Sequence, residues 1–195
     1  SLDASSIQVH FLNASGNVLS SAPPIPAPES WRYPSCDGNF AATLAPAGDW
    51  DGDAVGDVLS GSPNCSSTGV VHLFTLTESG AVRDTRWIVP GMAGFQPTVT
   101  PETFGASVAS IGDVNGDDVE DIVVATKADT TQTLYVIFLD ATGAATSNNL
   151  IDTGDIVGIA GQGFPTSLTN MGDLDGDMVS DLAIGLSLAS SSAGA

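Results

Sequence analysis

The chain has 195 residues, of which 42% are hydrophobic and 14% are charged, enough for one globular domain or one repeat array. Only 4 Lys and Arg residues accompany 23 Asp and Glu residues, so the net charge is −19 and no basic patch can meet nucleic-acid phosphates. No run of about 20 apolar residues occurs, and we therefore expect no membrane span.

The first predicted element is a β-hairpin over residues 7–20. An alternating apolar run leads into the turn Asn-Ala-Ser-Gly, which ends at Gly16, and a return strand follows. The same pattern recurs around Gly80 and Gly143, and the three glycines are spaced by 64 and 63 residues. This spacing predicts an internal repeat.

A connector containing Pro or Gly follows each hairpin, and we interpret it as a long loop on one rim of the fold. The connectors lie at residues 22–28, 90–101 and 158–161. A short strand comes next in each repeat. These strands are expected at residues 40–44, 104–111 and 164–168.

A nine-residue acidic loop then occurs in each repeat, at residues 49–57, 113–121 and 173–181. Oxygen-bearing side chains occupy positions 1, 3, 5 and 9, Gly occupies position 4, and Val occupies position 7. Alternate residues of a tight loop point inward, the carbonyl at position 7 can join them, and glycine permits the turn. The expected ligands are Asp49, Asp51, Asp53, Val55, Asp57, Asp113, Asn115, Asp117, Val119, Asp121, Asp173, Asp175, Asp177, Val179 and Asp181.

Ca²⁺ is the ion that suits such a loop, because it accepts six or more oxygens at flexible distances, whereas Mg²⁺ demands a stricter octahedron. The loops hold no Cys or His, which argues against Zn²⁺ and Cu²⁺. Plain acidic turns are the alternative, but three copies in register disfavour them. An EF-hand is rejected, because it needs Gly at position 6, Glu at position 12 and flanking helices. The sequence therefore predicts three Ca²⁺ sites.

The stretch from Phe104-Gly105 through Gly112-Asp-Val-Asn-Gly-Asp117 to Asp121-Ile-Val-Val-Ala125 resembles the FG-GAP repeat. The resemblance covers nearly the whole chain. It implies an all-β fold of FG-GAP-type β-propeller blades like those of integrin α subunits, with Ca²⁺ bound in hairpin loops on one face and roles in adhesion and recognition. Phe-Gly is replaced by Phe40-Ala41 and Phe164-Pro165 in the other repeats.

We divide the single array, residues 1–195, into three four-stranded units of about 60 residues, at about 1–62, 63–126 and 127–195. Three units are too few to close a propeller, which takes about four to eight blades. The chain is therefore a fragment of a longer propeller, or it closes with its N-terminal hairpin on the C-terminal strand, or it pairs head to tail with other subunits. The last hypothesis predicts a filament.

Low Lys content and abundant Ser, Thr, Ala and Gly predict an extracellular or cell-surface, secreted chain, and the start at Ser1 fits a processed chain or an excised piece. Cys36 and Cys65 flank the first acidic loop, and we expect them to form a disulfide. Asn13 and Asn64 begin glycosylation sequons. The three Trp residues are candidates for rim packing or for contact with a glycan.

No catalytic residues are expected, since His10 and His72 do not converge and no nucleophile elbow is present. The predicted function is that of a non-catalytic, calcium-binding extracellular repeat protein with a structural or adhesive role, a subunit of a surface or filamentous assembly. The alternatives are a ligand-recognition propeller fragment of a larger integrin-like adhesion protein, or the non-catalytic module of a secreted hydrolase or lyase. Expected partners are other protein subunits, including further copies of this chain.

Overall fold

The computed structural model describes residues 5–28, 40–65, 67–97, 103–127, 132–152 and 164–187. All regular structure in these ranges is β, as the sequence predicts, and every sheet is antiparallel. Within the described ranges no helix is long and apolar enough to cross a membrane.

Two four-stranded sheets form the centre of the molecule. The first has the order β5-β6-β7-β8 and the second the order β9-β10-β11-β12. Their strands are β5 (Thr43–Pro46), β6 (Val58–Ser62), β7 (Val70–Leu76), β8 (Val82–Ile88), β9 (Ser107–Gly112), β10 (Asp121–Lys127), β11 (Gln132–Leu139) and β12 (Ala145–Asp152).

Three strand pairs complete the described structure. The first two are the N-terminal turn hairpin β2–β3 and the C-terminal hairpin β13–β14, and the third joins β1 to β4. Their bounds are β1 (Ser6–Ile7), β2 (His10–Leu12), β3 (Val18–Ser21), β4 (Ile25–Pro26), β13 (Phe164–Asn170) and β14 (Leu182–Ser187).

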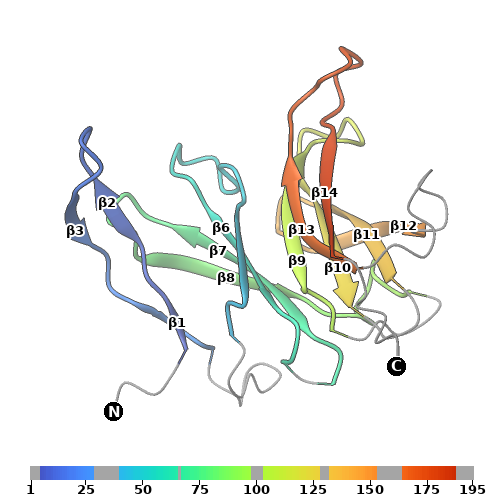
Figure 1. The fold of residues 1–195 in the computed structure, drawn as a ribbon, viewed down its shortest axis with the longest axis horizontal. Coiled ribbons are helices and arrows are strands. Elements are labelled where there is room, and N and C mark those ends of the chain that lie inside the picture. Colours follow the sequence, from blue (N-terminus) through green and yellow to red (C-terminus); the bar gives the residue numbers. More distant parts are fainter. Residues whose placement is uncertain are drawn as a thin grey trace, which may run out of the picture.

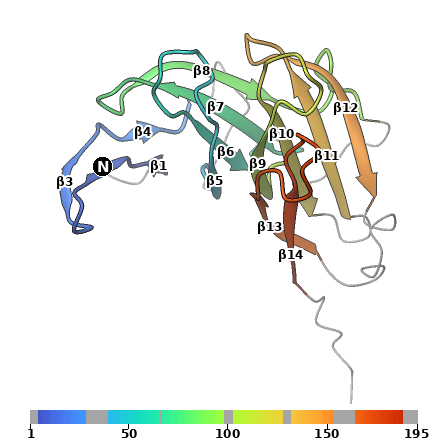
Figure 2. The ribbon, with the colours of Figure 1, turned by 90° about the horizontal axis from the view of Figure 1, so that it is seen from above.

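The sheets stand side by side around an open arc, with β5, β9 and β13 toward its inside and β8 and β12 toward its outside (Figure 2). The hairpins β2–β3 and β13–β14 lie at the two ends of this arc and do not meet (Figure 1). The arrangement is consistent with propeller blades. The described strands do not close into a ring.

Each complete sheet consists of an acidic-loop hairpin followed by a turn hairpin. Two four-stranded sheets of this kind form in the described ranges, and one hairpin, β2–β3 or β13–β14, stands outside them at each end. Each hydrogen-bonded sheet therefore joins the acidic-loop hairpin of one predicted unit to the turn hairpin of the next. The limits 1–62, 63–126 and 127–195 remain an interpretation of the sequence. Local patterns predict hairpins, but pairing between hairpins is decided by long-range packing.

The main core lies between the two four-stranded sheets. Phe95, from the connector, packs against Phe104 with tilted rings whose centroids are 5.1 Å apart, and it makes an edge contact with Tyr135 at 5.3 Å. All three side chains are buried. Burying rings of this size contributes about 2–3 kcal/mol each.

The Phe-Gly pair of the repeat has a clear structural basis. Phe104 fills the core, and its N–H donates to the carbonyl of Thr68, 2.8 Å away. Gly105, at φ +91°, lies against Gly61 of the first sheet so closely that a Cβ on Gly61 would stand 2.2 Å from the Gly105 oxygen. The two sheets therefore meet backbone to backbone.

Candidate metal loops

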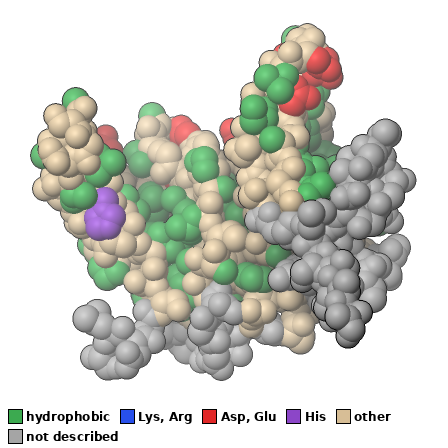
Figure 3. Space-filling view, in the orientation of Figure 1, with side chains coloured by type: hydrophobic (Ala, Val, Ile, Leu, Met, Phe, Trp, Pro, Cys, Tyr) green, Lys and Arg blue, Asp and Glu red, His purple; other side chains and the backbone are tan. Residues whose placement is uncertain are grey.

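The three acidic loops connect β5 to β6, β9 to β10 and β13 to β14, and all project from the same side of the molecule (Figure 1). Acidic side chains gather along this rim in the space-filling view (Figure 3). The hairpin β13–β14 carries its loop farthest from the sheets.

The three loops share one backbone conformation. In each, φ is positive at the glycine before the loop, at the glycine in position 4 and at position 6. Position 6 is Ala54, Asp118 or Met178, with φ of 65°, 64° and 72°. Sequence analysis predicted the glycine turn but not the left-handed residue at position 6, because Ala and Met rarely adopt this conformation and only Asp118 is of a type that favours it.

The carboxylate at position 1 organises each loop from within. One oxygen of Asp49 accepts the N–H of Asp53 and the other accepts the N–H of Ala54, both at 2.9 Å. Asp113 and Asp173 accept the corresponding N–H groups at 2.7–3.1 Å. Each carboxylate oxygen has two lone pairs, so these hydrogen bonds leave capacity for a cation.

The carboxylate at position 9 joins the loop to the neighbouring hairpin. Asp57 accepts the N–H of Trp50 inside the loop and the N–H of Leu76 on β7, both at 2.8 Å. Asp121 does the same with Val114 at 3.2 Å and with Leu139 on β11 at 3.1 Å. Both carboxylates are buried.

Burial is the main influence on the pKa of these two carboxylates. It raises the pKa of Asp57 and of Asp121, and the neighbouring loop carboxylates raise it further, although the two backbone N–H donors oppose the shift. At the exposed loop entrance, desolvation of Asp113 is outweighed by donors such as the N–H of Asp118, and its pKa is lowered.

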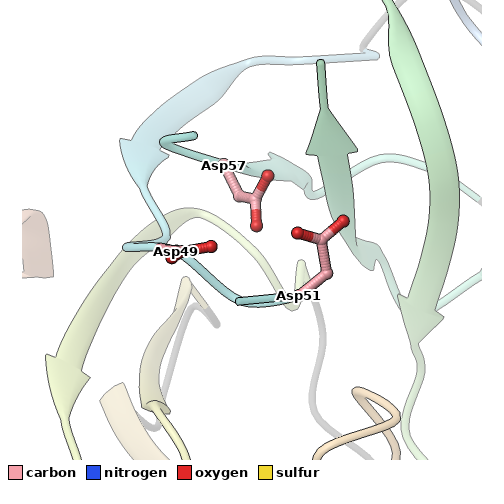
Figure 4. Close-up of side chains that lie close together, drawn as sticks. All are labelled: Asp49, Asp51 and Asp57. Atoms are coloured by element: carbon pink, nitrogen blue, oxygen red, sulfur yellow. The ribbon is translucent and has the colours of Figure 1, made fainter. Parts of the chain in front are cut away.

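The structure brings some predicted ligands together. Carboxylate oxygens of Asp49, Asp51 and Asp57 lie within 4.8 Å of one another, and their side chains point toward a common centre (Figure 4). In the third loop, Asp173, Asp175 and Asp177 form a similar group. Asp181 stays apart from that group, and the backbone oxygens of the three Val residues remain predicted ligands only.

Asp53 forms an ion pair with Arg83, a residue that the sequence analysis did not identify. On β8, Arg83 places one guanidinium nitrogen 2.9 Å from an oxygen of Asp51 and the other 2.5 Å from an oxygen of Asp53. A cation thus already sits between two predicted ligands of the first loop. Thr146 takes the corresponding place after the turn glycine Gly143, so the second sheet has no such arginine there.

A cation fits these loops on two observations. Inward oxygens converge in the first and third loops, and in the first loop the guanidinium of Arg83 already contacts one member of the group, Asp51, together with Asp53. The donors are hard oxygen atoms, the type that Ca²⁺ prefers.

The other predicted residues are placed as follows. Cys65 is buried and is not a free thiol, but Cys36 lies outside the described residues, so their disulfide stays a prediction. Asn13 uses its side-chain oxygen to accept the N–H groups of Ser15 and Asn17 in its turn, and Asn64 is exposed. Glycosylation of either residue is untested.

The histidines lie on neighbouring hairpins with opposite exposure. His72 is buried between Phe40 and Phe74, whose ring centroids are 5.6 and 5.7 Å away. His10 is exposed and contacts the hydroxyl of Ser21 at 2.8 Å. Burial lowers the pKa of His72 to about 4.

Comparison with known proteins gives one informative similarity. The chain is 28% identical over 159 residues to integrin alpha-4 of Xenopus laevis. The match covers 79% of the chain but 15% of that integrin subunit. No protein-family model matches the sequence. The similarity supports an integrin-like relationship for this repeat fold.

Proposed function

We propose that this chain is a non-catalytic, calcium-stabilised module of extracellular propeller type with a structural or adhesive role. The observation that carries the proposal is the common construction of the three loops. Each has the same spacing of acids, the same left-handed positions and the same hydrogen bonds to its first carboxylate. Chance acidic turns have no reason to share all three features.

The ions act on stability rather than on chemistry. The residues that would hold them are those at positions 1, 3, 5, 7 and 9 of each loop. A bound Ca²⁺ supplies positive charge where carboxylates crowd, which offsets their mutual repulsion. The chain's own contribution is to preform the loop, through the backbone N–H groups that orient Asp49, Asp113 and Asp173.

The adhesive and extracellular part of the proposal is supported by the similarity to an integrin α subunit. Because the match covers 15% of that subunit, the role of the whole protein does not transfer automatically. A recognition fragment is the alternative that a specific observation favours. A cleft of about 520 Å³ between the two sheets is lined by Trp50, Arg83 and Arg86 among others. It offers an indole ring beside two guanidinium groups that are paired with Asp51, Asp53 and Asp84.

Calorimetric titration with Ca²⁺ and thermal unfolding test the metal proposal. Exposed extracellular sites have Kd values of roughly 10⁻⁴–10⁻³ M. At about 10 mM Ca²⁺, each site then stabilises the fold by about 1.4–2.7 kcal/mol. We expect three binding events and a rise in Tm that the same concentration of Mg²⁺ does not match. An unchanged Tm in Ca²⁺ would refute the proposal.

A further inference from the structure

The cleft between the two four-stranded sheets is built from three elements. The first acidic loop provides Trp50, the paired strands β7 and β8 provide Thr75 and Arg86, and the turn between β11 and β12 provides Thr142. A hydrogen bond joins the two sheets here, because Nε of Arg86 donates to the carbonyl of Thr142 at 2.9 Å. The volume of about 520 Å³ is in the usual range for small-molecule sites.

Two buried polar groups of this cleft have no hydrogen-bond partner among the described residues. They are the indole N–H of Trp50 and the hydroxyl of Thr75, a residue that is only 8% exposed. An unpaired polar group destabilises a fold when it is buried, so its presence calls for an explanation. A ligand oxygen would satisfy both groups, because the indole N–H donates and the hydroxyl either donates or accepts.

The charged side chains that line the cleft balance one another. Arg83 pairs with Asp51 at 2.9 Å, and Arg86 pairs with Asp84 at 2.7 Å. Asp53, outside the lining, holds the other terminal nitrogen of Arg83. A guanidinium carries more N–H donors than these contacts use, and a carboxylate keeps free lone pairs. The cleft therefore offers both donors and acceptors, and the four charged groups of its lining carry no net charge.

We propose that this cleft binds a neutral sugar, as one unit of a glycan, through Trp50, Thr75 and Arg86. A sugar presents neighbouring hydroxyl groups that donate and accept, which suits a guanidinium beside a carboxylate. The C–H face of its ring is apolar and packs on an aromatic ring such as the indole. An anionic ligand is disfavoured, because it would approach a chain of net charge −19 beside the carboxylates of the first acidic loop.

A sugar-binding cleft gives the recognition alternative its ligand class, and it rests on that alternative. It is separable from the calcium role, because Trp50, Thr75 and Arg86 are not expected metal ligands. Asp51 belongs both to the cleft and to the first acidic loop, so sugar titrations belong in a fixed millimolar concentration of Ca²⁺. Sugar binding without Ca²⁺ binding would refute the metal role alone, and Ca²⁺ binding without sugar binding would refute the cleft proposal alone.

NMR of the ¹⁵N-labelled chain tests the site with the methyl glycosides of glucose, galactose, mannose and N-acetylglucosamine. The indole N–H resonance of Trp50, assigned by its loss in Trp50→Phe, should shift in a saturable way with at least one glycoside. The resonance of Trp87, which does not line the cleft, should stay in place. Sodium acetate at the same concentration is the anionic comparison. No saturable shift with any glycoside, or an equal shift with acetate, overturns the proposal.

Thr75→Val and Thr85→Val form a matched pair for measuring affinity. Valine has a similar shape to threonine but no hydroxyl, and Thr85 lies on β8 outside the cleft lining. Thr75→Val should weaken glycoside binding about threefold to tenfold without lowering Tm, because the hydroxyl has no partner in the described fold. Thr85→Val should leave the affinity unchanged. An unchanged affinity in Thr75→Val, or an equal loss in both variants, overturns the assigned site.

Discussion

Replacing the buried His72 by Phe should remove a specific acid sensitivity of the fold. The folded chain holds this imidazole neutral, with a pKa of about 4 instead of 6.5, because burial disfavours the charged form. The unfolded chain takes up the proton first as pH falls. Stability from the neutral ring is therefore present above pH 6.5 and is lost as pH falls toward 4.

The magnitude follows from the two pKa values. A difference of about 2.5 pKa units corresponds to about 3 kcal/mol, of which about 2 kcal/mol is already lost at pH 5. Urea unfolding at several pH values, in fixed Ca²⁺, gives the free energy of unfolding for the wild type and for His72→Phe. The difference between the two curves isolates the imidazole from the many carboxylates. The exposed His10→Gln variant is the matched control.

Parallel curves for the wild type and His72→Phe between pH 7 and 4 would refute this reasoning, because they would mean that His72 is protonated without cost in the fold. A free energy of unfolding that falls more steeply with decreasing pH in His72→Phe than in the wild type would equally contradict it.

Three further predictions concern the loops and the seam between the sheets. Asp117→Ala should lower Tm in Ca²⁺ and change it little in chelator. The control Asp118→Ala should leave Tm in Ca²⁺ nearly unchanged, because Ala54 already occupies the equivalent left-handed position in the first loop. An equal loss of Tm with Asp117→Ala in both solutions would contradict a metal role. Gly61→Ala should cost about 1–3 kcal/mol of unfolding free energy, because its Cβ meets the Gly105 oxygen, and Gly56→Ala, with open space around it, is the control in the same urea experiment. Arg83→Gln should raise the Ca²⁺ affinity of the first loop about threefold by calorimetry, because Asp51 and Asp53 lose a competing cation, and Arg86→Gln should leave it unchanged.

The local elements of this fold are predictable from the sequence because each depends on neighbouring residues. Alternation and a turn glycine predict the hairpin ending at Gly16, and the acid spacing predicts the loop at 113–121 as a hairpin connection. The Phe-Gly resemblance singles out Phe104, and the structure places that ring in the core. These signals act over fewer than ten residues.

Contacts between distant residues could not be derived in the same way. Arg83 reaches Asp51 across 32 residues, and nothing in the spacing of the loop indicates it. The burial of His72 depends on Phe40, from the segment that precedes β5. The docking of Leu76 onto Asp57 decides which hairpins share a sheet, and it becomes visible only when both are folded.

The carboxylate at position 9 has a consequence for how the molecule opens. Asp57 and Asp121 each receive one amide proton from their own loop and one from the strand beyond it. In amide hydrogen exchange, Leu76 and Leu139 should therefore be protected together with the loops that hold them, so that each four-stranded sheet opens as one cooperative unit. Among the described residues no strand beyond β14 donates such an amide to Asp181, so the hairpin there should exchange independently and earlier.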